Sequence, residues 1–162
     1  LKPAFNKDGV VTAANASSIN DGAAAMVVAD AETATAMGLK PLARIVCQAT
    51  AAKEPQWFTL APIDAIKNAL AKANLSVADI DLWEINQAFS VVSVATFREL
   101  GLDGAKVDVN GGAVAIGHPI GASGARILAT LLYAMEDRKA RYGLATLCIG
   151  GGEAFAMIFE RI

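Results

Sequence analysis

The sequence predicts an α/β fold in which a mixed β-sheet is covered by helices. From residue 42 onward, apolar runs of strand length alternate with segments of helical periodicity, in the order β-α-β-α-β-α-β-β. A three-glycine connection, residues 150–152, joins the last two strands and favours an antiparallel hairpin. Alternation of this kind is typical of a sheet with helices packed on its faces.

The N-terminal quarter of the chain predicts little structure of its own. Residues 1–21 are polar and contain an Asp-Gly pair that suggests a tight turn. Residues 22–30, GAAAMVVAD, predict a short strand buried on both faces, and residues 31–37 predict a short helix that a glycine ends. This apolar surface is too small to fold alone. We therefore expect residues 1–40 to be the tail of a preceding domain and residues 41–162 to be a domain of their own.

Each later element has its own sequence signal. Apolar and β-branched runs predict strands at residues 42–52, 82–86, 107–109, 143–149 and 154–162. Apolar side chains at helical spacing predict helices at residues 62–74, 89–100 and 127–135. Ligands gather outside strand ends in sheets of this kind. We therefore expect Asn86, His118 and Cys148, each of which lies at the end of a predicted strand or after one, to converge.

Composition excludes several classes of protein. Hydrophobic residues make up 54% of the 162 residues and charged residues 19%, which predicts a large core rather than disorder. A formal net charge of −2 with scattered basic residues argues against a nucleic-acid partner. No apolar run is long enough to span a membrane and no signal peptide is evident, so we expect a cytosolic or organelle-lumen protein, and we predict the cytoplasm. The two cysteines lack disulfide-framework or metal-site spacing.

The most distinctive stretch is residues 110–126, NGGAVAIGHPIGASGAR. Five glycines and one proline surround His118, the only histidine of the chain. A glycine-rich loop before a helix can bind phosphate, but the Lys and Ser or Thr of a phosphate-binding loop are missing after Gly124. We interpret the loop as a mount for His118, and a hydrogen-bonded structural histidine is the alternative.

Cys148 is the second candidate for chemistry. A thiol becomes a good nucleophile or acid/base only when a nearby imidazole, amide cluster or helix end assists its ionisation. Three glycines with unhindered N–H groups follow Cys148 almost directly, and His118 is the only imidazole available. Asn86 has a side chain that can hold a water or orient a carbonyl. Cys47 lies inside a predicted strand and is interpreted as a small buried hydrophobe.

Four segments together resemble the C-terminal half of the thiolase family. They are NASSINDGAAA (15–25), NQAFS (86–90), NGGAVAIGHPIGASGAR (110–126) and GLATLCIGGG (143–152), in the order and spacing of that family. The resemblance runs from end to end of the chain. It implies the thiolase fold, with residues 1–40 as the tail of the N-terminal domain and residues 41–162 as the C-terminal domain.

The resemblance also implies an activity: the Claisen condensation of two acetyl-CoA to acetoacetyl-CoA, and its thiolytic reverse. It implies that His118 activates a cysteine nucleophile of the N-terminal domain and that Cys148 is the acid/base at the substrate α-carbon. His118, with a water held by Asn86, would stabilise the enolate, and the Gly150 N–H would contribute to an oxyanion hole. The CoA thioester is then a substrate, and no cofactor or metal is expected.

The same resemblance implies a set of substrate-binding residues. Ser17 matches a serine that contacts the pantetheine. The substrate tunnel would be lined by Phe5, Phe58, Ala88 and Phe89. Other interpretations remain open, since Phe58 and Phe89 could be ordinary core residues and Ser17 could serve a turn or helix cap.

Some residues depart from the family pattern. Gln87 stands where the family usually has glutamate, Ser18 replaces a glycine, and Glu153 follows the three glycines. The cysteine that accepts the acyl group has no counterpart here, because Cys47 lies in a different motif. We therefore expect the chain alone to be inactive, with the missing N-terminal domain as its partner and a homo-oligomer as the full-length enzyme.

Two other functions compete with this one. A ketoacyl synthase shares the fold but lacks the cysteine-glycine hairpin and needs a second histidine, whereas this chain has one. A non-catalytic CoA-binding or lipid-binding module, or an assembly module, would keep the fold without turnover. Gln87 and Glu153 are the residues that favour this alternative.

Overall fold

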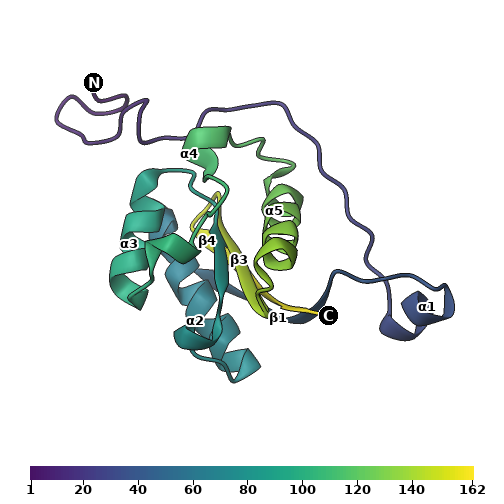
Figure 1. Ribbon diagram of the computed structural model, residues 1–162. Helices are drawn as coiled ribbons and strands as arrows, with labels where there is room; N and C mark the ends of the chain where they lie inside the picture. Colours follow the sequence, from purple (N-terminus) through teal and green to yellow (C-terminus); the bar gives the residue numbers. More distant parts are fainter.

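One mixed four-stranded sheet organises the chain in the computed structural model, which describes residues 1–162 (Figure 1). The strands are β1 (Ala43–Ala52), β2 (Leu82–Ile85), β3 (Tyr142–Ile149) and β4 (Glu153–Arg161). Their order across the sheet is β1-β4-β3-β2, with β2 parallel to β3 and the other two pairs antiparallel. The predicted α/β fold and the predicted hairpin of β3 and β4 are both confirmed.

Helices cover both faces of this sheet (Figure 1). The helices are α1 (Ala31–Ala36), α2 (Ala61–Ala73), α3 (Ser90–Leu100), α4 (Ala113–Ile116) and α5 (Ser123–Arg138), with 3₁₀ turns at Pro55–Leu60, Val77–Asp79 and Gly104–Lys106. Helices α2 and α3 lie on one face and α5 on the other, while α1 stands away from the sheet. None of the helices is both long and apolar enough to cross a membrane.

The core divides into two apolar clusters, one on each face of the sheet. Successive side chains of a strand point to opposite faces, and β3 follows this rule. Leu144 belongs to the cluster with Ile66 of α2, whereas Ala145 belongs to the cluster with Ile127 and Leu131 of α5. Leu144, Ile66, Ile127 and Leu131 are each at most 1% exposed. Burial on both faces explains why β3 reads as an almost continuous apolar run.

Two predicted strands are wrong. Residues 22–30 form no strand, and Val27 and Val28 are 90% and 74% exposed. A strand needs a neighbouring strand to satisfy its N–H and C=O groups, and none of this chain's strands runs beside this segment. Residues 107–109 make only a single bridge, Val107 with Trp83, because the positive φ of 45° at Asp108 ends the extended backbone there.

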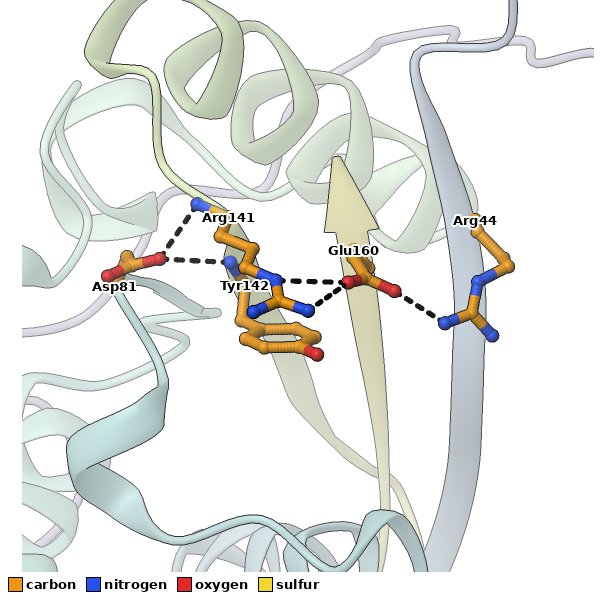
Figure 2. Close-up of polar contacts among 5 residues, drawn as sticks. All are labelled: Arg44, Asp81, Arg141, Tyr142 and Glu160. Atoms are coloured by element: carbon orange, nitrogen blue, oxygen red, sulfur yellow. Dashed lines mark hydrogen bonds and ion pairs between the residues drawn. The ribbon is translucent and has the colours of Figure 1, made fainter. Parts of the chain in front are cut away.

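A charged cluster fastens the end of the sheet that lies away from the β3–β4 turn (Figure 2). Glu160 of β4 accepts hydrogen bonds from Arg44 of β1 and from Arg141, and these bonds hold the pKa of its carboxyl below the ordinary value. Asp81 accepts the backbone N–H groups of Arg141 and Tyr142 at 2.8 and 2.9 Å. This cluster ties three strands together at that end of the sheet, through ion pairs whose arginines are exposed and which therefore contribute little to stability.

Candidate active site

The loop that carries His118 contains the short helix α4, which sequence analysis did not predict. Gly117 ends this helix with a positive φ of 94°. A Cβ atom at Gly117 would lie 2.3 Å from Asn20 Oδ1, and one at Gly112 would lie 2.8 Å from Gln87 Oε1. Both glycines therefore make room for other parts of the chain. Gly121, by contrast, has open space around it.

Residues 15–20 clamp this loop to the rest of the site. Their first part pairs with residues 88–90, where α3 begins, through two backbone hydrogen bonds of 2.8 and 2.9 Å. Their last part pairs with His118, whose N–H lies 3.0 Å from Ser18 O and 3.2 Å from Asn20 Oδ1. The three motifs that lie apart in the sequence thus meet around one histidine.

Both ring nitrogens of His118 have partners. Nε2 lies 3.4 Å from Asn86 Nδ2, and Nδ1 lies 2.6 Å from Ser123 Oγ. The Ser123 hydroxyl is buried and donates to Pro119 O at 3.0 Å. Burial and then the positive charge of Arg126 lower the pKa of His118 below its ordinary value of 6.5. The imidazole is therefore oriented, and it is neutral at neutral pH.

Beneath the histidine lies a layer of buried polar groups. Arg126, in the first turn of α5, places Nη1 3.5 Å from Glu84 Oε2 and Nη2 3.4 Å from Asn86 Oδ1. Burial, with the neighbouring Asp108 carboxyl, raises the pKa of Glu84 to about 8, although Arg126 opposes the shift. Burial also raises the pKa of Asp108 to about 6, against a hydrogen bond from the Ile85 N–H and the charge of Arg126. At neutral pH, Glu84 keeps its proton while Asp108 is ionised.

Sequence analysis missed four residues of this layer: Glu84, Asp108, Ser123 and Arg126. Ser123 and Arg126 belong to the glycine-rich motif, three residues apart, and this spacing places them on one side of a helix. Glu84 had the clearest signal, because a carboxyl group in a four-residue strand that is buried throughout has to find a partner.

Cys148 lies at the same edge of the sheet as Asn86. The Asn86 N–H donates to Thr146 O at 2.9 Å, two residues before Cys148, which itself pairs with Ala154. The thiol is half-buried, and burial raises the pKa of Cys148 above its ordinary value of 9.0. Next to the thiol, the Gly150 N–H donates to no backbone carbonyl.

The predicted convergence is thus confirmed for Asn86 and His118, which are in contact. Cys148 lies at the same edge of the sheet as Asn86. Its place in a common cleft with His118 stays a prediction. Cys47 is buried in the apolar core with its Sγ 3.3 Å from Ala69 O, as expected of a small buried hydrophobe.

The predicted substrate-binding residues fall into two groups. Ser17 and Ala88 are joined by a backbone hydrogen bond of 2.9 Å, and the rings of Phe89 and Phe58 meet edge to face with centroids 6.1 Å apart. Ser17 precedes Ser18, whose carbonyl accepts the His118 N–H, while Phe58 reaches this group only through its contact with Phe89. Phe5 is 79% exposed and has no ring contact with them. No three or more His, Cys, Asp or Glu side chains are grouped as ligands for a metal ion.

Comparison with known proteins identifies the family. Residues 39–161 match the model described as "Thiolase, C-terminal domain", and residues 1–32 match "Thiolase, N-terminal domain". The chain belongs to the thiolase family. The four motifs of the site, from the segment at residues 15–20 to the glycines after Cys148, are therefore parts of a thiolase.

Individual thiolases show the same relationship. The chain is 56% identical over 162 residues to the acetyl-CoA acetyltransferase of Escherichia coli K12, covering 100% of this chain and 41% of that protein. The crystal structure of the Bacillus anthracis acetyl-CoA acetyltransferase superposes with a TM-score of 0.97 at 47% identity. Human mitochondrial 3-ketoacyl-CoA thiolase in complex with CoA superposes at 0.92 with 39% identity. Both superpositions include 100% of this chain and 41% of the chain of the solved structure.

Proposed function

We propose that this chain provides the acid/base part of a thiolase active site. The reaction is the Claisen condensation of two acetyl-CoA to acetoacetyl-CoA and its thiolytic reverse. The observation that carries the proposal is the contact between Asn86 and His118. The imidazole is neutral, both of its ring nitrogens have polar partners, and Asn86 lies at the edge of the sheet where Cys148 lies. Relatives named acetyl-CoA acetyltransferase, and a thiolase bound to CoA, support an acyl-CoA substrate.

Each residue has a distinct role in this proposal. The neutral His118 has a lone pair with which to take the proton of a nucleophilic thiol, since it is not already protonated at neutral pH. Cys148 exchanges a proton with the α-carbon of the acetyl thioester. A thiol with a raised pKa is a stronger base once ionised, which suits a weakly acidic carbon. The Gly150 N–H and a water bound to Asn86 offset the negative charge on thioester oxygens.

The cysteine that carries the acyl group lies outside these residues in our proposal. Cys47 cannot serve, because it is buried in the core and bonded to a helix carbonyl. The chain spans 41% of the length of its relatives, and we infer that the nucleophile belongs to the remaining part of the N-terminal domain. Residues 1–40 are proposed as the tail of that domain, and the 162 residues alone are expected to show no turnover.

A chimera tests this proposal. The 162 matching residues of the Escherichia coli acetyl-CoA acetyltransferase are replaced by this chain, and thiolysis of acetoacetyl-CoA by CoA is measured. We expect turnover in the chimera and none in the 162-residue chain. Loss of the general acid or base lowers rates by about 10²- to 10⁴-fold, which is the effect expected for Cys148→Ala.

Cys47→Ala is the matched control, since it removes the other thiol of the chain and is expected to keep the rate of the chimera. A folded chimera that binds CoA without turnover would contradict the proposal and favour a non-catalytic CoA-binding module. Turnover that survives Cys148→Ala at the full rate would also contradict it.

A further inference from the structure

We propose that Arg126, held by Glu84, is a positioning residue that fixes the orientation of the Asn86 amide and, through it, the tautomer of His118. This inference rests on the proposed function only for its consequence in catalysis. Its structural part is derived from a chain of polar contacts that begins at a group able only to donate hydrogen bonds and ends at a group able only to accept them.

The first half of this series of polar contacts begins at Arg126. A guanidinium has only donors, so the Asn86 atom 3.4 Å from Nη2 is the carbonyl oxygen Oδ1. The Asn86 amide nitrogen Nδ2 then faces His118 Nε2 at 3.4 Å. An amide nitrogen is also only a donor, and Nε2 therefore has to accept. The orientation of one amide thus determines which ring nitrogen of the histidine carries no proton.

The second half of this series of polar contacts begins at the Pro119 carbonyl. Pro119 O only accepts, so the Ser123 hydroxyl donates to it across 3.0 Å. The oxygen of this hydroxyl then has a lone pair for the hydrogen on His118 Nδ1, which lies 2.6 Å away. Both halves assign the proton of the neutral imidazole to Nδ1. Two independent ends of the chain of contacts therefore agree on one tautomer.

Stability alone does not explain the arginine. Glu84 has a side chain that is 2% exposed, and the Arg126 side chain is 18% exposed. Even so, Glu84 Oε1 and Arg126 Nε are buried without any hydrogen-bond partner. Buried polar groups that lack hydrogen-bond partners lower the stability of a fold, and apolar side chains of similar volume can often replace them without loss. A role in orienting Asn86 gives this incompletely bonded pair a function that core packing does not.

The catalytic consequence follows from the tautomer. With the proton on Nδ1, Nε2 is the basic atom of the ring, and a nucleophilic thiol takes the place of the Asn86 N–H, 3.4 Å away, as the donor to its lone pair. Without the guanidinium, the Asn86 amide can rotate and present its oxygen to Nε2, which favours the tautomer protonated there. A histidine protonated at Nε2 cannot act as a base at that atom. Arg126 thus acts through Asn86 and not on the substrate.

Nitrogen NMR of the 162-residue chain labelled with ¹⁵N-histidine tests the inference directly. His118 is the only histidine, so one pair of ring signals reports its tautomer without assignment by mutation. We expect a protonated Nδ1 and an unprotonated Nε2 in the unaltered chain at neutral pH. A proton on Nε2 in this chain would overturn the inference even if no variant folded.

Two variants then test the arginine. Arg126→Met removes the donor and is expected to shift the tautomer ratio at least about tenfold toward Nε2–H, the effect of about 1.4 kcal/mol. Arg126→Lys keeps a side chain that can only donate and should restore most of the original ratio. An unchanged ratio in a folded Arg126→Met chain would overturn the role of Arg126. This measurement needs no thioester and no turnover, so its outcome is independent of the chimera assay.

Discussion

Two glycine-rich loops present the two groups that we propose for proton transfer, and the chain treats them differently. His118 lies in a loop that residues 15–20 clamp, and both of its ring nitrogens have polar partners. Cys148 lies near the end of β3, before the β3–β4 turn, where its thiol is half-buried and packs against the apolar cluster of that face. The chain therefore orients the imidazole by itself, whereas it supplies the thiol only with a position at the sheet edge and an apolar surrounding.

This difference reflects what each group needs for proton transfer. An imidazole serves as a base at one nitrogen, so its orientation and tautomer have to be set in advance. A thiol has a single sulfur atom that accepts a proton from many directions, so orientation matters less than the pKa. The rigid loop and the open turn are thus suited to different groups. The three predictions below are directed at these two regions, in order of decreasing expected effect.

The largest effect is expected in the polar layer beneath His118. Glu84 has its pKa raised from 4.5 to about 8, so the folded chain holds a proton that the unfolded chain has lost. The contribution of Glu84 to the free energy of unfolding is therefore complete below pH 4.5 and is lost as the pH rises toward about 8, by an amount on the order of a few kcal/mol. Asp108 contributes in the same direction between pH 3.8 and about 6.

Glu84→Gln should make this loss of stability shallower, because an amide does not titrate. The measurement is the free energy of unfolding in urea across the same pH window. Glu136→Gln, on the exposed surface of α5, is the matched control and should leave the pH dependence as it is. A Glu84→Gln chain whose stability falls as steeply as that of the unaltered chain would contradict the prediction.

An intermediate effect is expected when glycines of the two loops are compared. Gly117→Ala places a Cβ 2.3 Å from Asn20 Oδ1 at a φ of 94°, and should lower the free energy of unfolding by about 2 kcal/mol. Gly150→Ala meets open space and should stay within about 0.5 kcal/mol. Urea unfolding of both variants measures the difference. Equal losses of stability would show that the His118 loop is no more constrained than the turn after Cys148.

The smallest effect concerns the titration of the two groups. The rate at which iodoacetamide alkylates Cys148 should rise with a midpoint above the ordinary thiol pKa of 9.0, because burial favours the neutral thiol. The NMR titration of His118 should have its midpoint below 6.5, because burial and Arg126 favour the neutral imidazole. Cys47→Ala removes the other thiol and leaves a single alkylation site. A Cys148 midpoint below 9.0 would contradict the apolar surrounding of the thiol.

Periodicity predicted the part of the fold that lies within the sheet, together with its helices. It failed for residues 22–30, because an apolar segment becomes a strand only when another strand runs beside it. It also failed at Asp108, where a positive φ that is rare outside glycine ends the extended segment after one bridge. Both failures concern partners or backbone conformations that composition does not encode.

For the site, sequence motifs predicted the groups that carry chemistry but not those that support them. His118 was found because it is the only histidine, and Asn86 because it follows a strand. Arg126 and Ser123 stood in the same motif as His118, yet their partners lie on other elements or in the turn before α5. Glu84 and Asp108 were missed because alternation of apolar residues suggests only where a chain is buried. The hydrogen bonds that satisfy a buried carboxyl become visible only in three dimensions.

The most direct test of the division of work between the two loops measures two exchange reactions in the chimera with the Escherichia coli relative. One is exchange of the acetyl-CoA α-hydrogens with deuterated solvent, and the other is exchange of label between acetyl-CoA and free CoA. We predict that Cys148→Ala lowers the first by about 10²- to 10⁴-fold and spares the second, whereas His118→Ala lowers both. Equal loss of both exchanges in Cys148→Ala, or loss of neither, would contradict the account.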